Sequence, residues 1–474
     1  RGGVFGAGRF APGRRRVVHL SVMRRAVGIT GLGTVCGLGV GAEALWDGLC
    51  APRSAIGPIR GFDASGLHAR LASEVPAYSV RDFVPKSYRK ATKVMCRDTE
   101  LAVVAASLAS GDAGLRTRAS EDDAEGFEIA GERLGCHIGA GLIAAETGEL
   151  GRAQATATDE RGAFSIRAWG TVGEEARGGM ENLTPLWMLK YLPNMPACHV
   201  TIVHGAEGPS NTITCFETSG LLSLGESARV IERGGADACF SGGTESKLNL
   251  VGMLRLEHAG RLAPVGEDEQ GDSVVRPYDA SATGGVAGEG AGILMVEAMD
   301  HARQRGARVY AQITGFGAAQ SFEGVDALYD EAEEPSDGLH DAIERALRDA
   351  GVTPDEIDAV VPGAHGAPAL DRAEAAALRR IFGDRLGEIP LVTTAPSIGS
   401  CVAGQGGLQA AVGALCLHKQ MLPGRIHAGS PSDGLRAEAC DPRDARLSHV
   451  LVCASGLGGQ NAALVLSRVG AERD

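Results

Sequence analysis

The sequence predicts an α/β fold built from two similar halves. Segments with strand-like and helix-like patterns alternate along the chain, and the alternation occurs twice, which is typical of strands and helices packed in layers. The side chains are small: 68 of the 474 residues are glycine and only 4% are aromatic. Helices and sheets can therefore approach each other closely, and the apolar share of 44% is enough for a large buried core.

The first half begins with a strand over residues 26–33 that runs into a glycine-rich turn. Gly31 and Gly33 suggest a dinucleotide-binding turn, but the third glycine of that pattern is missing and no acidic residue closes a second strand. The pattern therefore argues against a Rossmann site. The next expected elements are helices over 41–50 and 87–115, a strand over 135–142, a polar insertion or flap over 145–181, and a helix over 183–195. The large side chains of that last helix line an interface or a substrate tunnel, or they belong to the core.

A strand, a sharp turn and a helix meet around residue 217. We expect the strand over 211–216 and the helix over 218–233, with an apolar face on the helix. A residue at such a corner lies at the mouth of a sheet and at the positive end of a helix, where enzymes place a nucleophile. The corner of this chain holds a carboxylate, Glu217.

The second half contains a similar series of elements. Acidic loops are expected over 266–272 and 323–337, and Asp337 then caps an amphipathic helix that stops at Gly351. A strand over 359–361 follows and delivers His365 to its C-terminal end. Open parallel sheets carry functional loops at that end of their strands.

Several motifs follow one another in a fixed order. They are the corner at 208–220 and the segments Ser241-Gly-Gly-Thr-Glu245, Arg276-Pro-Tyr-Asp279, 288–297 and 456–461. In this order and at this spacing they resemble the β-ketoacyl synthase (ketosynthase) family, over roughly residues 25–469. The resemblance implies the thiolase-like five-layer α-β-α-β-α fold made of two similar halves. It also implies an N-terminal ketosynthase half over 23–272 and a C-terminal half over 273–469.

The resemblance also assigns the catalytic positions. Active members of the family have a cysteine at the corner, two histidines and a lysine. Here Glu217 stands at the cysteine position, His365 is the first histidine, Ala395 stands at the lysine position, and Ser400 at that of the second histidine. Only one of the four catalytic groups remains.

Further positions of the family's substrate pocket carry over in the same way. Ala367 stands where the family has a threonine that helps hold the pantetheine arm, and Ser455 where it has a gating phenylalanine. The glycines of that C-terminal segment are Gly456 and Gly458. The acidic pair that follows the first histidine is represented by Asp371 and Glu374.

These replacements predict a subunit that no longer condenses acyl chains. A carboxylate is a far poorer nucleophile than a thiolate, and decarboxylation needs two imidazole donors for the developing enolate. The pattern resembles the chain-length-factor (KS-beta) subunits of polyketide synthases, although those carry glutamine at the corner. We expect the chain to pair with an active β-ketoacyl-ACP synthase and to shape its acyl tunnel.

Other readings remain open at this point. The chain could be an enzyme, a malonyl-carrier decarboxylase or an acyl transferase acting through Glu217 and His365, or it could be a homodimeric pseudoenzyme. Cys215 could serve as a displaced nucleophile, but we expect it to be a buried structural thiol. His365 is either placed as a catalytic histidine or only hydrogen-bonds Glu217. An apolar strand with Ile213 and Cys215 should not remain an exposed edge, which predicts a dimer.

Composition limits the remaining classes of function. The net charge of −13 argues against nucleic-acid binding, and the scattered histidines give no metal site. The 11 cysteines show no paired spacing, which favours reduced thiols and a cytoplasmic location. We expect no bound cofactor, because a separate acyl carrier protein would hold phosphopantetheine-bound acyl chains. The arginine-rich residues 1–22 are expected to be a disordered leader or to precede the true start at Met23.

Overall fold

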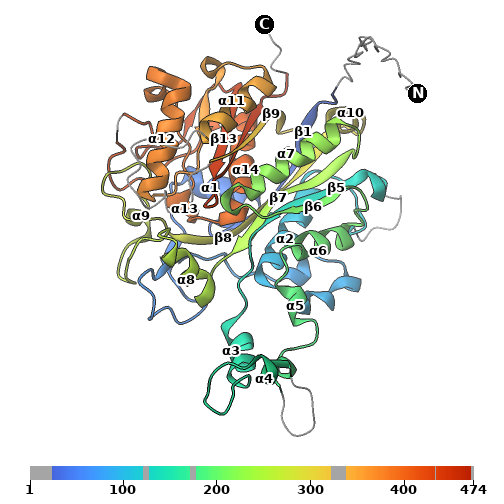
Figure 1. Ribbon diagram of the computed structural model, residues 1–474. Coiled ribbons are helices and arrows are strands. Elements are labelled where there is room, and N and C mark those ends of the chain that lie inside the picture. The colour runs from blue at the N-terminus through green and yellow to red at the C-terminus, as the bar shows by residue number, and fades with distance from the viewer. Residues whose placement is uncertain (1–23, 121–127, 171–177, 322–337, 433, 471–474) are drawn as a thin grey trace, which may run out of the picture.

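The main sheet of the computed structural model has twelve strands, and its two halves, which we name the first and the second sheet, alternate with three layers of helices (Figure 1). The structure describes residues 24–120, 128–170, 178–321, 338–432 and 434–470. The prediction for residues 1–22 and the predicted cap Asp337 lie outside these residues. The first sheet has the order β6-β5-β7-β8-β1. Its strands are β1 (Val27–Cys36), β5 (Leu134–Ala140), β6 (Ser210–Ile213), β7 (Ala238–Ser246) and β8 (Ala287–Ala298).

The second sheet continues from the first. Its order is β9-β14-β13-β10, and it joins the first sheet where Gly28 and Ile29 of β1 pair with Gln312 and Ala311 of β9. Its strands are β9 (Ala311–Gln320), β10 (Ala359–Val361), β13 (His449–Ser455) and β14 (Gln460–Ser467). The remaining short strands are β2 (Gly39–Val40), β3 (Ile56–Pro58), β4 (Leu71–Ser73), β11 (Met421–Leu422) and β12 (Arg443–Asp444).

Helices cover both outer faces of the two sheets and fill the space between them. The central layer consists of α7 (Ser219–Glu232) and α14 (Gln405–Lys419), which pack against strands of both sheets and against each other. The outer helices are α2 (Arg97–Asp112) and α6 (Met195–His204) on the first sheet, and α11 (Gly338–Ala350) and α12 (Pro368–Phe382) on the second. This layer order confirms the five-layer prediction.

The remaining helices lie around this core. They are α1 (Ala42–Cys50), α3 (Thr147–Ala155), α4 (Ile166–Gly170), α5 (Trp187–Lys190), α8 (Leu250–His258), α9 (Gly271–Val274), α10 (Met299–Gln304) and α13 (Ala395–Ile398). The predicted boundary at residue 272 stays a prediction. The strand β8 follows that boundary and pairs with β1 and β7 of the first sheet.

Small residues set the spacing of the central layer. Gly243 of β7 lies so close to the chain of residues 402–404 that an added Cβ would fall 1.9 Å from the carbonyl oxygen of Ala403. A Cβ on Gly220 of α7 would likewise meet the backbone of Gly407 in α14 at 2.8 Å. The glycines that preserve the family pattern therefore pack the corner helix tightly against α14 and the first sheet.

Three predicted elements differ from the structure. The helix expected over 87–115 begins at Arg97, and 3₁₀ turns precede it, because the stretch before Arg97 has no apolar face to stabilise a helix. The helix expected over 183–195 is only the four-residue α5, since Pro193 interrupts it and α6 starts at Met195. The corner strand ends at Ile213, and Phe216 takes a left-handed φ of 49°.

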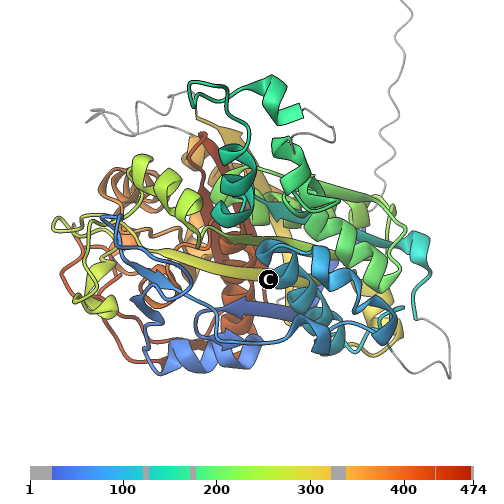
Figure 2. The same cartoon turned by 90° about the horizontal axis from the view of Figure 1, so that it is seen from below.

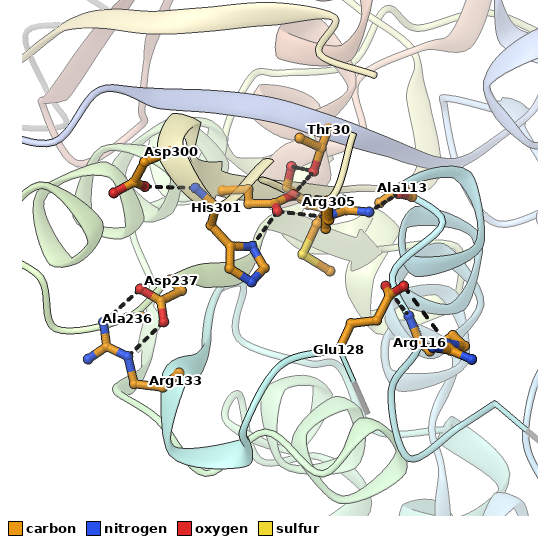
Figure 3. A network of polar contacts seen from close by, with 12 residues as sticks. Thr30, Ala113, Arg116, Glu128, Arg133, Ala236, Asp237, Asp300, His301 and Arg305 are labelled. Atoms are coloured by element: carbon orange, nitrogen blue, oxygen red, sulfur yellow. Dashed lines mark hydrogen bonds and ion pairs between the residues drawn. The ribbon is translucent and has the colours of Figure 1, made fainter. Parts of the chain in front are cut away.

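A buried network fastens β1 to β8 and α10 (Figure 3). Glu297 of β8 is fully buried and accepts hydrogen bonds from Thr30 (2.7 Å) and Arg305 (2.8 Å), and it contacts His301 at 2.6 Å. Burial raises the pKa of Glu297, but the bonds from Arg305, Thr30 and His301 outweigh it and hold that pKa below its ordinary value. Arg305 also donates to the carbonyl of Ala113 just after α2. The network ties the segment after α2 to the first half of β1 and to the end of β8.

The predicted polar flap is an arm of the molecule. Helices α3 and α4 stand off the body in both views (Figure 1; Figure 2). Lys190 and Tyr191 anchor its base by bonding Glu149 at 2.7 and 2.8 Å. The arm and its base expose large apolar side chains: Leu142, Phe164, Ile166, Met180, Leu186 and Met188 are each more than half exposed. A lone chain thus presents apolar surface of the kind that partners cover.

Candidate functional site

The corner is a tight turn that hydroxyl groups hold together. Ser219 accepts a hydrogen bond from the Cys215 amide (2.8 Å) and donates to the Phe216 carbonyl (2.6 Å), while Thr218 donates to the Cys215 carbonyl (2.6 Å). These bonds fix the turn between β6 and α7. They place Glu217 directly before the first turn of α7, with only 2% of its surface exposed.

Glu217 forms a buried ion pair. One carboxylate oxygen, Oε1, lies 2.6 Å from Nη2 of Arg261, and the other, Oε2, accepts a hydrogen bond from the amide of Leu457 at 3.3 Å. Arg261 follows α8 and is 9% exposed. Leu457 belongs to the turn between β13 and β14. The corner is thus closed by side chains and backbone from both halves of the chain.

Arg261 is only partly satisfied. Its Nε and Nη1 are buried and have no hydrogen-bond partner among the described residues. Burying a guanidinium is costly unless its donors are paired, so Glu217 is the contact that holds this side chain in place. Removing Glu217 would leave a buried positive charge without a counter-ion.

His365 lies at the same site but does not bond Glu217. Its Nε2 is buried without a hydrogen-bond partner in the described part of the chain, so the alternative in which His365 only hydrogen-bonds Glu217 is wrong, and its placement as a catalytic histidine stays a prediction. The physical reason is that Arg261 and the Leu457 amide take the two oxygens of Glu217. Burial is the largest cause that lowers the pKa of His365; Glu217 raises this pKa and Arg261 lowers it. The pKa that results from all three is about 4. The imidazole is therefore neutral near pH 7.

Two carboxylates shape the loop that carries His365. Asp371 accepts bonds from the amides of His365 (2.9 Å), Gly366 (3.0 Å) and Tyr278 (3.0 Å). Glu374 accepts bonds from the amides of residues 363 and 364 and from the Tyr278 hydroxyl. Burial raises the pKa of Asp371 to about 7, although the backbone donors oppose this. The acidic pair is thus a scaffold that bends the loop after β10.

The other predicted positions lie around this centre. Ala395 starts α13 and is 1% exposed. Ser400 pairs with Ala287 at the start of β8, and its amide donates to the carbonyl of Val286 just before that strand at 2.8 Å. Ala367 is buried at the start of α12, and the Ser455 hydroxyl donates to Asn461 at 2.7 Å. Among the described residues, neither Ala395 nor Ser400 hydrogen-bonds Glu217 or His365. Their roles as catalytic positions stay predictions.

The glycines of the C-terminal segment form the turn that faces the corner. Gly456 donates to the Gln460 carbonyl at 2.7 Å, and a Cβ on Gly456 would lie 2.8 Å from the Cys215 carbonyl oxygen. The carbonyl oxygen of the neighbouring Gly458 accepts a hydrogen bond from the side-chain amide of Gln320. Cys215 itself is half-buried and follows the end of β6, so the expectation of a buried thiol on a strand is wrong. Burial raises the pKa of its thiol, which argues against a displaced nucleophile.

A cavity of about 510 Å³ opens elsewhere, at the base of the arm. Its lining includes Arg97, Asp98, Lys190, Tyr191 and Glu289. Glu217, Arg261 and His365 are not among its lining residues. Within the described residues, no group of acidic, histidine or cysteine side chains could hold a metal ion, and no helix has the length and apolar character needed to cross a membrane.

Comparison with known proteins decides the family. The model of the β-ketoacyl synthase N-terminal domain matches residues 24–302, and that of the C-terminal domain matches residues 310–429. The chain belongs to the β-ketoacyl synthase family.

Two curated ketosynthases cover nearly the whole chain. A 3-oxoacyl-(acyl-carrier-protein) synthase 2 of Coxiella burnetii is 30% identical over 94% of this chain and 99% of its own. The tetracenomycin polyketide synthase ketoacyl synthase beta subunit of Streptomyces glaucescens is 31% identical over 93% of this chain and 98% of its own. Sequence similarity therefore extends to fatty-acid type synthases and to a polyketide beta subunit alike.

A solved structure gives the same result. The ishigamide ketosynthase/chain length factor superposes with a TM-score of 0.76 at 26% identity, and the match covers 94% of this chain and all of that one. The thiolase-like fold predicted from the motifs is thereby confirmed.

Sequence reasoning missed Arg261 and the part played by Tyr278. Arg261 lies 44 positions beyond Glu217 and stands alone in an apolar stretch, so no spacing rule links the two. Tyr278 belongs to one of the family motifs, but its bonds to Asp371 and Glu374 appear only in three dimensions. The one available signal for Arg261 was that a buried carboxylate at position 217 requires a positive partner.

Proposed function

We propose that this ketosynthase-family chain is a condensation-inactive subunit that pairs with an active β-ketoacyl-ACP synthase and shapes its acyl tunnel. The observation that carries the proposal is the ion pair of Glu217 with Arg261 at the position where an active member carries its cysteine. An acyl chain on a carboxylate would be a labile anhydride, so the corner offers no stable covalent carrier. The proposal agrees with the likeness to a ketoacyl synthase beta subunit and to a ketosynthase/chain length factor.

The surface of the lone chain supports pairing. The strand β6 ends the first sheet and is bonded to β5 on one side only among the described strands. Ser210 and Asn211 are exposed, and Phe216, just beyond the strand, is 37% exposed. An unpaired strand edge beside an exposed aromatic side chain favours a second ketosynthase-fold subunit that continues the sheet.

An acyl carrier protein is the second proposed partner. A solved relative with the same fold is described as a type II PKS acyl-carrier protein in complex with its ketosynthase. A carrier would reach this chain through the active subunit of the pair, because the corner of this chain is closed.

Co-expression tests the proposal. The chain is produced together with an active ketosynthase from the same source, and native mass spectrometry measures the stoichiometry. We expect a 1:1 complex that extends acyl chains, and we expect an active-site cysteine knockout of the partner to stop the reaction. A chain that purifies only as a homodimer, indifferent to the partner, would contradict the proposal.

The alternative is an enzyme of the β-ketoacyl-ACP synthase class that acts through Glu217 and His365. A decarboxylase would have to receive the malonyl carboxylate next to the carboxylate of Glu217. Arg261 could not neutralise the second negative charge as well, because it already forms an ion pair with Glu217. Release of carbon dioxide from malonyl carrier protein, abolished by Glu217→Ala, would establish it. Absence of release at every pH from about 5 to about 9, a range that spans the ordinary pKa values of glutamate and histidine, would remove it.

A further inference from the structure

Two features of the corner bear on acyl loading. The first is the missing thiol at position 217. The second is the guanidinium of Arg261, which is buried and lies against that position with Nη2 2.6 Å from the carboxylate. An acyl group on residue 217 would have to share the corner with this side chain, because the two residues are in contact and both are buried.

We propose that Arg261 is a plug that closes the corner to acyl groups, so that loading is blocked by occupied space as well as by the lost thiol. The inference rests on the proposed function and deepens it, since it names the residue that keeps this subunit out of the reaction. Three observations carry it: Glu217 is 2% exposed, Arg261 is 9% exposed, and neither lines the cavity at the base of the arm.

The plug carries a buried charge. Nε and Nη1 of Arg261 find no partner among the described residues, and Nη2 bonds Glu217. Backbone bonds to Leu256 and Gly285 position residue 261 independently of that ion pair. His365 adds no positive charge that would compete for Glu217 near pH 7, because burial lowers its pKa to about 4. A polar side chain this incompletely bonded is costly to bury, which distinguishes it from ordinary core packing.

The backbone that carries Arg261 is fixed by neighbouring segments. A Cβ on Gly285 would lie 2.7 Å from the His365 carbonyl oxygen and 3.3 Å from that of Arg261. The Arg261 amide is bonded to the Leu256 carbonyl at 3.0 Å, and the Gly285 amide is bonded to the Arg261 carbonyl at 2.9 Å. The segment that carries the plug is therefore fixed between α8 and the loop of His365.

The test restores a thiol at the corner and varies the plug. The three full-length variants are E217C, E217C/R261A and E217C/R261K. Iodoacetamide is the probe: the thiolate sulfur displaces iodide from its carbon, the S–C bond forms and the thiol proton goes to solvent. Mass spectrometry of the digested protein gives the rate of modification at residue 217. Cys215, which occurs in every variant, serves as the internal reference.

Obstruction by the Arg261 side chain and the effect of its charge on the thiol pKa predict opposite orders of the alkylation rates. A neighbouring cation lowers a thiol pKa and speeds alkylation, so charge alone would make E217C and E217C/R261K faster than E217C/R261A. A plug predicts that the introduced thiol reacts at least about tenfold more slowly in E217C than in E217C/R261A, with the lysine variant between them. Equal rates in all three variants, or a faster rate with arginine present, would overturn the proposal.

Two controls keep the result unambiguous. Alkylation of Cys136, which is fully buried, reports unfolding, and a variant that modifies Cys136 is compared only over the fraction that remains folded. If the introduced thiol stays unreactive even in folded E217C/R261A, another group closes the corner and the proposal is wrong. A chain that purifies only as a homodimer, indifferent to an active ketosynthase, would contradict the proposed function but not the plug, so the two failures are distinguishable.

Discussion

The Glu217 corner and the His365 loop lie together in the fold but differ in how well their polar groups are satisfied. In the loop, Asp371 and Glu374 each accept three hydrogen bonds from the backbone and Tyr278. At the corner, Arg261 has one bonded nitrogen and two without partners among the described residues. The scaffold around the catalytic positions of the family is complete, while the groups at the reacting position form an under-bonded ion pair.

This difference indicates which part of the site the fold needs. A buried carboxylate that accepts three hydrogen bonds determines the path of the chain, so it must remain whatever the protein does. A buried ion pair adds little to net stability and can be replaced by apolar groups, so its presence calls for a functional reason. The ion pair at the corner therefore fits the proposed role of this chain, whereas the bonds of the loop maintain the fold.

The largest expected effect concerns the corner. Arg261→Met leaves the carboxylate of Glu217 buried without its cation and should lower the free energy of unfolding by about 3–5 kcal/mol. The double variant E217Q/R261M removes both charges and should lie within about 1 kcal/mol of the wild type. Urea unfolding of E217Q, R261M and the double variant measures the coupling free energy between the two side chains.

An exposed pair gives the matched control. Arg348 and Glu344 of α11 lie 3.1 Å apart with side chains that are more than half exposed. Arg348→Met should cost less than about 0.5 kcal/mol. If the losses at Glu217 and Arg261 simply add, the two side chains are not coupled and the plug loses its basis.

The next effect concerns the loop. Asp371→Ala leaves the amides of His365, Gly366 and Tyr278 without their acceptor and should cost about 3 kcal/mol. Asp371→Asn keeps one carbonyl oxygen and should cost less. Urea denaturation measures both, and an alanine variant as stable as the wild type would show that these bonds do not hold the loop.

Sequence patterns locate the scaffold well. The corner helix, the strand before the glycine-rich turn and the amphipathic helix before Gly351 appear where periodicity predicts them, as α7, β1 and α11. Local apolar spacing determines such elements, so one sequence is enough to find them. Boundaries that depend on a proline or on a missing apolar face, as at α2 and α5, are predicted less well.

The sequence predicts which residues lie at the site but not which of them contact each other. Motif order brings Glu217 and His365 to one site, because motifs in register identify a family and its fold. The partner of Glu217 is mispredicted, since the motifs place a histidine nearby and say nothing of Arg261. A contact between residues 217 and 261 depends on how α8 packs over the corner, and no local pattern carries that information.

A smaller effect comes from pH. Burial lowers the pKa of His365 from its ordinary value of 6.5 to about 4. Between these values the unfolded chain binds the proton and the folded chain does not. The free energy of unfolding therefore falls as the pH falls through this range, by about 2 kcal/mol at a pH of about 5. His365→Gln lacks this loss.

The comparison of wild type and H365Q isolates this effect. Asp371 makes the free energy of unfolding change with pH in the opposite direction. Its pKa is raised to about 7 in the folded state, so its protonation stabilises the folded state at low pH. It is present in both proteins, as are Glu217 and Arg261, which face His365. Thermal or urea unfolding from a pH of about 7.5 down to about 4.5 should therefore show the wild type losing stability relative to H365Q. A constant difference would mean that His365 is not buried in neutral form.

The smallest expected effect on stability comes from glycine substitutions at one position of the corner and one position of the His365 loop. Phe216 at the corner and Ala364 in the loop both have left-handed backbones, with φ of 49° and 46°. Glycine relieves that strain but gives the unfolded chain more freedom, and the two terms nearly cancel. Phe216→Gly and Ala364→Gly should each change the free energy of unfolding of the lone chain by less than about 0.5 kcal/mol.

Partner binding should then distinguish the two variants. Phe216 is 37% exposed beside the edge strand β6, whereas Ala364 is fully buried. If a second ketosynthase-fold subunit covers that edge, Phe216→Gly weakens the complex at least about tenfold in an interaction assay with the active partner, because an aromatic side chain at an interface core carries much of the binding energy. Ala364→Gly leaves the affinity unchanged. Equal affinity for both variants would mean that the partner does not cover the corner, and that the aromatic side chain is retained there for a reason unrelated to pairing.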